Sequence, residues 1–135
     1  MDLPDAPEFS ITCDLRWSDF DRLGHLNQAV YHVLLEQARV AWLNAVRPAD
    51  LERWQAWVLA RVELDYRREV DSTHTQVIAA CRPLTLGTSS LVVAHELRHL
   101  DGTVAATGSC VLVAWDAKAR GKRAFTEGER AAYVG

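Results

Sequence analysis

The chain has 135 residues, of which 49% are hydrophobic and 24% are charged, and this balance argues against intrinsic disorder and favours a soluble globular protein. The length suits one hydrophobic core, so we expect residues 1–135 to form a single domain. A net charge of −3 provides no overall attraction for nucleic acid or anionic lipid, and we expect neither nucleic acid nor a membrane as a partner.

Two sequence features indicate the cellular compartment. The N-terminal segment MDLPDAPEFS lacks the basic and apolar stretches of a secretion signal, and no apolar run approaches the roughly 20 residues that span a bilayer. The cysteines Cys13, Cys81 and Cys110 are far apart and form no CxxC pair, which favours buried, reduced thiols over disulfides or a zinc site. We therefore expect a cytoplasmic protein.

The first predicted elements are a strand, a polar loop and a long helix. Residues 9–17 alternate between apolar and polar side chains, as in a half-buried strand. The polar segment SDFDRLGHLN then ends on Asn27, a residue type that often caps a helix N-terminus. Residues 28–46 contain neither Gly nor Pro and place apolar residues close to the 3.6-residue period, which predicts one long helix that ends shortly before Pro48.

Four further strands are predicted after the helix. Residues 57–66 alternate again, and a strand over 72–82 is expected to end before Pro83, because proline lacks a backbone donor. Strands over 88–100 and 103–116 form a hairpin around Asp101-Gly102, a pair that suits a two-residue type I′ turn. The charged tail is predicted to be a loop with a short C-terminal turn or helix.

The segment HELRH at residues 95–99 fits the H-E-x-x-H pattern, in which two histidines one helical turn apart share a zinc ion. The hairpin signature places it on a strand, where His95 and His99 would lie about 13 Å apart. They could not bind one metal ion, and we expect no metal site. The hairpin register instead places His95 opposite Gly108 and Leu97 opposite Ala106, so the missing side chain would leave room for the imidazole.

The order of elements is typical of an α+β fold in which one helix covers one face of an antiparallel sheet. One helix covers a five-stranded sheet of this length poorly. We therefore expect self-association along a sheet edge, with a homodimer as the default assembly.

Residues 17–31, WSDFDRLGHLNQAVY, concentrate polar groups where the first strand leads into the helix. The first N–H groups of a helix lack partners and, with the helix dipole, can bind a carbonyl oxygen that gains negative charge. A carboxylate from Asp19 or Asp21 could attack a carbonyl or activate a water. The same spacing also fits solvated turn acids, a helix cap at Asn27 and a packing histidine at His25.

The segment RWSDFDRLGHLNQAVYHVLLEQARVAWL resembles the opening of the 4-hydroxybenzoyl-CoA thioesterase-like acyl-CoA thioesterases, which have the hot-dog fold. Their pattern runs approximately R-x-x-D-x-D-x-x-G-H-x-N-x-x-Y-x-x-x-x-E-x-A-R and is matched by Arg16, Asp19, Asp21, Gly24, His25, Asn27, Tyr31, Glu36, Ala38 and Arg39. The segments VLARVELDYRREV, LGTSSLVVAHEL and DGTVAATGSCVLVAWDAKARGKRAF resemble the later strands and the closing hairpin more loosely. The resemblance covers most of the chain.

This resemblance implies a long central helix wrapped by a five-stranded antiparallel sheet, in a dimer with a continuous sheet and two active sites at the subunit interface. It implies hydrolysis of an acyl- or aroyl-CoA to the free acid and coenzyme A. The essential carboxylate maps onto Asp21, as nucleophile or as general base toward water. The backbone N–H of Gln28, helped by that of Ala29, would bind the thioester oxygen, while His25 and Asn27 would shape the site or hold water.

The resemblance also implies supporting roles. Asp19 would fix the loop, and Glu36 would pair with Arg39 on the helix, although Glu36 is an alternative carboxylate because some hot-dog thioesterases take theirs from the central helix. No cofactor is implied beyond the coenzyme A of the substrate. The expected substrate-binding residues are Tyr31, Tyr66, Arg67 and Arg68. Further candidates for the phosphates of coenzyme A are Arg82, Lys118, Arg120, Lys122 and Arg123. An acyl pocket could be lined by Trp42, Trp54, Trp57 and Trp115, which are also typical core or interface residues.

Two positions depart from the family pattern. Gln28 replaces a second Asn that many relatives carry, which leaves the backbone donor in place. Glu69 follows Tyr66, Arg67 and Arg68 where relatives often have Pro, so the resemblance does not define the edge of the acyl pocket or the identity of the substrate.

Two other functions are compatible with this fold. One is a non-catalytic acyl-thioester binding protein, and the other is a hot-dog dehydratase or hydratase, although the chain lacks the Gly-His-Phe-Pro and Asp-x-Asn-Pro-x-His runs of such enzymes. The acyl group, the choice between coenzyme A and an acyl-carrier protein, the exact role of Asp21, and the choice between a dimer and a dimer of dimers all remain open at this stage.

Overall fold

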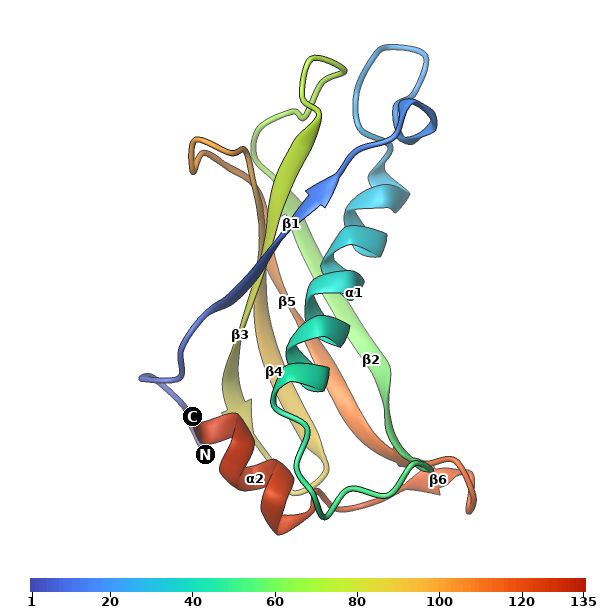
Figure 1. Ribbon diagram of the computed structural model, residues 1–135, viewed down its shortest axis with the longest axis vertical. Coiled ribbons are helices and arrows are strands. Elements are labelled where there is room, and N and C mark those ends of the chain that lie inside the picture. Colours follow the sequence, from blue (N-terminus) through green and yellow to red (C-terminus); the bar gives the residue numbers. More distant parts are fainter.

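The computed structural model describes all residues 1–135, and its elements follow the predicted order (Figure 1). They are β1 (Phe9–Asp14), the 3₁₀ turn η1 (Trp17–Asp19), α1 (Gln28–Ala45), β2 (Gln55–Tyr66), β3 (Gln76–Leu86), β4 (Ser90–Arg98), β5 (Val104–Asp116), β6 (Gly121–Lys122) and α2 (Glu127–Val134). No helix of the chain combines the length and the apolar character needed to span a bilayer.

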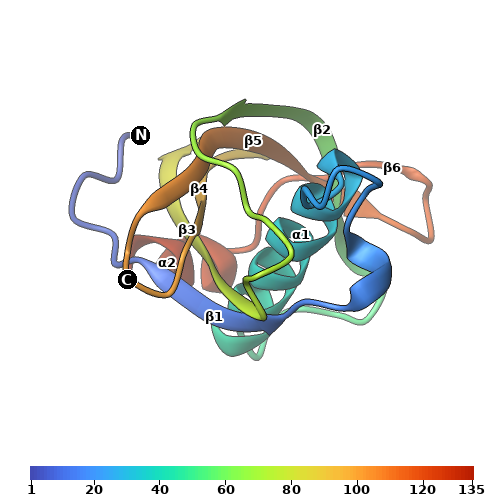
Figure 2. The ribbon, with the colours of Figure 1, turned by 90° about the horizontal axis from the view of Figure 1, so that it is seen from above.

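The strands form one antiparallel sheet in the order β1, β3, β4, β5 and β2, and β6 pairs with the end of β5. Viewed from above, the sheet curves around α1 (Figure 2). The predicted α+β class and the hot-dog arrangement of a central helix wrapped by an antiparallel sheet are confirmed. The sheet has six strands because the two-residue β6 adds one to the five that were predicted.

α1 is held on the sheet by its apolar face. Leu34, Leu35, Ala38 and Trp42 are each at most 5% exposed, and burying a leucine side chain stabilises a fold by about 1.5–3 kcal/mol. The N-terminal half of the helix shares its core cluster with Leu26 and Val70. The start of α1 therefore forms one packed unit with the loop before it and with the connection between β2 and β3.

β2 is an outer strand of the sheet, and most of its residues are exposed. Val58, Leu59 and Val62 are apolar side chains on this exposed strand. A cavity of about 240 Å³ lies between α1 and β2 and is lined partly by Trp57 and Leu59. Proteins normally cover or charge an apolar edge strand, so this exposed apolar edge is unusual. The homodimer expected from the sequence stays a prediction.

The prediction that the third strand ends before Pro83 is wrong, because β3 continues to Leu86. The pairing with β4 changes register between Pro83 and Thr85. A proline without an N–H is tolerated next to such an irregularity.

The hairpin between β4 and β5 has the predicted register but a different turn. The N–H of Gly102 donates to the carbonyl of His99 at 3.0 Å, so the turn runs from His99 to Gly102. Gly102 is the only residue of this turn with a positive φ, whereas a type I′ turn needs two. A second irregularity between Leu97 and Arg98 compensates for the longer turn. The predicted pairs His95 with Gly108 and Leu97 with Ala106 are therefore confirmed.

His95 is buried beneath α1 and has a packing role. Its Nε2 lies 2.9 Å from the carbonyl oxygen of Glu63 in β2. A Cβ atom on Gly108 would lie 2.1 Å from the same oxygen, so the imidazole reaches this oxygen across a position that only glycine can occupy. Burial lowers the pKa of His95, which favours the neutral imidazole.

Candidate active site

The loop that leads into α1 is fixed at its start by Asp19. Its side chain is 4% exposed, and its oxygens accept hydrogen bonds from the backbone N–H of Arg16 at 2.7 Å and from the guanidinium of Arg16 at 2.9 Å. Burial opposes ionisation of Asp19, but the hydrogen bonds from Arg16 outweigh it, and the pKa of Asp19 lies below its ordinary value. The role expected for Asp19 fits this geometry.

Asp21 has one carboxylate oxygen engaged in the loop. Its Oδ1 accepts hydrogen bonds from the backbone N–H groups of Leu23 at 2.9 Å and His25 at 3.0 Å. Gly24 completes this tight turn with a φ of +76°, which favours glycine. No side chain or backbone group of the chain donates to Oδ2. The exposed carboxylate is therefore oriented through one oxygen while the other can face a substrate or a water.

The first turn of α1 offers one free backbone donor. The side chain of Asn27 caps the helix by accepting the N–H of Ala29 at 3.0 Å, which confirms the predicted cap. The expectation that Ala29 helps to bind the thioester oxygen is therefore wrong, because its N–H is already engaged. The N–H of Gln28 has no acceptor within the chain.

The loop over residues 19–27 is closed by backbone contacts between its two ends, and it carries Asp21 and leads into the start of α1. Phe20 forms a β-bridge with Leu26, and the N–H of Asn27 donates to the carbonyl of Asp19 at 2.8 Å. Asp21 directly follows Phe20, and Gln28 lies two residues after Leu26. The carboxylate and the free N–H are thus carried by adjacent parts of one closed loop.

The connection between β2 and β3 holds this loop from outside. The carbonyl of Val70 accepts the N–H of Leu26 at 2.7 Å, and the N–H of Ser72 donates to the carbonyl of Gly24 at 2.9 Å. Glu69 extends from the same connection, with its Oε2 2.8 Å from Nε2 of His25. Sequence reasoning noted Glu69 only as a departure from the family pattern and missed this contact.

Four other expected site residues lie near the helix start or beyond the end of β2. Tyr31 is buried and meets the half-exposed ring of Tyr66 edge to face, with centroids 4.9 Å apart. The hydroxyl of Tyr66 points to the carbonyl of Gln28 at 3.5 Å. Arg67 and Arg68 both donate their backbone N–H to the carbonyl of Ala105. Both side chains are exposed, and the guanidinium of Arg67 lies 3.9 Å from the carboxylate of Asp65.

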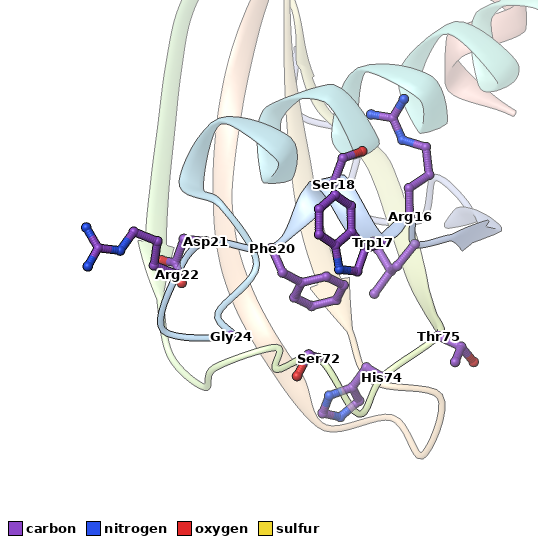
Figure 3. Close-up of a pocket in the computed structure, with 11 residues that line it drawn as sticks. Arg16, Trp17, Ser18, Phe20, Asp21, Arg22, Gly24, Ser72, His74 and Thr75 are labelled. Carbon is purple, nitrogen blue, oxygen red and sulfur yellow. The ribbon is translucent and has the colours of Figure 1, made fainter.

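A cavity of about 680 Å³ adjoins the loop, with Asp21 among its lining residues. Figure 3 shows that its lining comes from two segments: Trp17 and Phe20 belong to the stretch before α1, and Ser72 and His74 belong to the connection between β2 and β3. Trp17 is 94% exposed, which is unusual for a tryptophan. Three of the eleven lining residues are hydrophobic, namely Leu15, Trp17 and Phe20, so most residues around the cavity beside the carboxylate are polar.

None of the four tryptophans considered for an acyl pocket lines this cavity. Trp42 is part of the hydrophobic core. Trp57 donates its indole N–H to Tyr133 at 2.9 Å, and Lys118 lies over the ring of Trp54. Trp17 was missed because nothing in the sequence distinguishes an exposed tryptophan from a buried one.

The predicted ion pair between Glu36 and Arg39 is not formed. Glu36 is exposed to solvent, whereas Arg39 is 6% exposed, and no carboxylate lies within 4.0 Å of its guanidinium. Residues three apart on a helix are neighbours only when both side chains lean toward each other, and here one of them turns inward.

No group of three or more histidine, cysteine, aspartate or glutamate side chains converges into a possible metal site. His95 and Glu96 lie on β4, and His99 follows directly after it, so the HELRH segment has the predicted strand conformation. The three cysteines are free and buried, as expected.

The chain is similar to known thioesterases along most of its length. The family model of the thioesterase-like superfamily matches residues 15–132. A thioesterase from Thermus thermophilus, solved in complex with coenzyme A and Zn, is 32% identical, with 93% of this chain and 90% of that chain covered and a TM-score of 0.81. The PA2801 protein of Pseudomonas aeruginosa is 29% identical, with 92% and 96% covered and a TM-score of 0.81.

Among curated proteins, the uncharacterized protein YsmA of Bacillus subtilis is 24% identical over 99 residues. The match covers 73% of this chain and 67% of that protein.

Proposed function

Because the chain belongs to the thioesterase-like superfamily, we propose that it hydrolyses the thioester of an acyl- or aroyl-CoA, with Asp21 as the reacting carboxylate. The family match supports thioester hydrolysis as the type of reaction. The observation that carries the assignment to residues is the closed loop that bears an exposed carboxylate, held by one oxygen only, and leads directly into the free N–H of Gln28.

The chemistry follows from these two groups. Asp21 either attacks the thioester carbonyl carbon or takes a proton from a water that attacks it. In both cases the carbonyl oxygen gains negative charge, which the N–H of Gln28 and the positive end of the α1 dipole stabilise. The carbon–sulfur bond then breaks, and the thiolate leaves and takes up a proton. When Asp21 attacks directly, the acyl group remains on it as a mixed anhydride, which a water then hydrolyses to regenerate the carboxylate. When Asp21 acts as base, the attacking water supplies both the oxygen of the acid and the proton for the thiolate. Both routes end in a carboxylic acid and free coenzyme A.

Coenzyme A is the carrier that the comparisons favour, because a thioesterase 32% identical to this chain was solved with coenzyme A bound. We assign the acyl end of the substrate to the neighbourhood of Tyr31 and Tyr66 at the start of α1. The exposed side chains of Arg67 and Arg68 lie just beyond Tyr66, where they can meet the phosphates of coenzyme A. His25 and Asn27 hold the loop and the helix cap in this scheme.

We further propose that the working protein is a homodimer formed along β2. The apolar side chains exposed on this strand, together with Val33 and Val40 on α1, support an interface on this side. Paired β2 strands would continue one sheet across both subunits. Size-exclusion chromatography with light scattering tests the dimer; a monomer at micromolar concentration contradicts it.

The activity is tested with a panel of acyl-CoA thioesters of increasing chain length together with aroyl-CoA thioesters. Release of free thiol, followed with a chromogenic disulfide, is expected for at least one class. Binding of an acyl-CoA without any turnover would contradict the proposal and would favour a non-catalytic binding protein.

The oxyanion role is tested by Gln28→Pro with Gln28→Ala as its matched control. Proline suits the first position of a helix, and Asn27 already has polyproline-II-like angles (φ −60°, ψ 133°), which are favourable before proline, so the fold should survive. Only the proline variant lacks the N–H. We expect it to lose about 100-fold or more in kcat, while the alanine variant stays close to the wild type. Equal activity of the two variants would exclude this donor.

A further inference from the structure

Glu69 is the nearest carboxylate to the imidazole of His25. Its Oε2 lies 2.8 Å from Nε2 of His25, and the two side chains are 60% and 47% exposed. The backbone of His25 also forms a β-bridge with Asp71 in the same connection. The side chain and the backbone of His25 are thus both held by residues 69–71.

The same histidine holds the reacting carboxylate. The N–H of His25 is one of two donors to Oδ1 of Asp21, and the carbonyl of His25 accepts the N–H of Asp21 at 2.8 Å. A shift of His25 would therefore change the direction in which Oδ2 points. One contact thus joins Glu69 to His25, and two hydrogen bonds join His25 to Asp21.

Glu69 is itself fixed to the rest of the fold. Its carbonyl oxygen lies 2.9 Å from Nε2 of His99, at the end of the β4–β5 hairpin. The ring of His99 stacks on His74, with centroids 4.3 Å apart, and Val70, the residue after Glu69, is fully buried. The backbone of Glu69 is therefore held in place, so its side chain can fix the position of the His25 imidazole.

We propose that Glu69 is a positioning residue for thioester hydrolysis, which acts by fixing the imidazole of His25 and thereby the orientation of Asp21. The inference rests on the function proposed above. A proline at position 69, as in many relatives, could not make the contact with His25. Glu69 itself is assigned no direct contact with the substrate.

The expected size of the effect is modest because the pair is half exposed. An exposed side-chain contact of this kind is worth at most about 1 kcal/mol, which corresponds to about a fivefold change in rate. We expect Glu69→Gln to lower kcat by roughly two- to fivefold, with KM nearly unchanged and partial recovery in Glu69→Asp. Glu52→Gln is the matched control, because Glu52 is an exposed glutamate whose carboxylate has no partner.

A double-mutant cycle separates positioning from a general loss of structure. In the background of His25→Ala, the change Glu69→Gln should have no further effect on kcat, since the path through His25 is already absent. If Glu69→Gln costs the same factor in both backgrounds, Glu69 does not act through His25 and the inference fails.

Amide hydrogen exchange tests whether Glu69 positions His25, and this measurement does not depend on enzymatic activity. The N–H of His25 should exchange faster in Glu69→Gln than in wild type, while the N–H of Ala29, held by Asn27, should not change. Unchanged exchange at His25 overturns the positioning role even in an active enzyme. An inactive wild type in which exchange responds as expected refutes the hydrolase function and leaves the structural contact standing.

Discussion

Gly108→Ala tests the packing of the sheet at the place where three strands meet. Gly108 in β5 lies opposite His95 in β4 and opposite Leu64 in β2. A Cβ atom there would lie 2.1 Å from the carbonyl oxygen and 2.8 Å from the carbonyl carbon of Glu63. These are backbone atoms, so rotation of a side chain cannot relieve the clash, and β2 must move away from β5.

The cost follows from two effects. Overpacking typically costs about 1–3 kcal/mol, and weakening the hydrogen bond between His95 and the Glu63 carbonyl adds about 0.5–1.5 kcal/mol. We therefore expect a loss of about 1.5–4.5 kcal/mol in the free energy of unfolding. For a chain of 135 residues, an unfolding entropy of about 2.1 cal/mol/K per residue converts this loss into a decrease of roughly 5–16 °C in Tm.

Urea denaturation and thermal unfolding, each followed by circular dichroism, measure the loss. Gly121→Ala is the matched control, because a Cβ atom at Gly121 would meet no atom within 4 Å, and its effect should stay within about 0.5 kcal/mol. The reasoning is refuted if Gly108→Ala is as stable as wild type, or if both variants lose stability equally.

Three further predictions concern the loop, acid stability and the buried thiols. Gly24→Ala places a side chain at a φ of +76°, which should cost about 1–2 kcal/mol in unfolding free energy and lower kcat; an unchanged urea midpoint would contradict the strain. The pKa of Asp19 is lower in the folded chain than in the unfolded chain, so the stability that it contributes is present above pH about 4 and is lost as the pH falls through the folded pKa. Urea titrations between about pH 2 and 6 should thus show a weaker acid dependence for Asp19→Asn, and identical curves would exclude the contribution. Burial raises the pKa of Cys81 to about 12, so a chromogenic disulfide should label the native protein far more slowly than the urea-unfolded protein, and equally fast labelling of both would contradict its burial.

Local signals predicted the elements that position the site. The 3.6-residue period and the cap at Asn27 gave the limits of α1 to within one residue, and alternation gave the strands. The pairing of His95 with Gly108 followed from counting outward from Asp101-Gly102. This pairing is correct although the predicted turn type is wrong, because the irregularity between Leu97 and Arg98 restores the register.

Contacts between distant segments could not be predicted in the same way. The contact between Glu69 and His25 joins residues on two connections whose approach depends on the packing of Leu26 and Val70 in one core cluster. Local spacing also misled in one case, since Glu36 and Arg39 are correctly spaced for an ion pair but burial of Arg39 prevents it.

The most direct test of the central claim is the kcat of Asp21→Asn on the best acyl-CoA substrate. Asparagine keeps the Oδ1 acceptor for the N–H groups of Leu23 and His25, so the loop and the unfolding midpoint should not change. We predict a loss of at least about 100-fold in kcat, as expected when a reacting carboxylate is removed, while the exposed control Asp5→Asn keeps full activity. A folded Asp21→Asn variant with wild-type kcat would contradict the assignment of Asp21 as the reacting group.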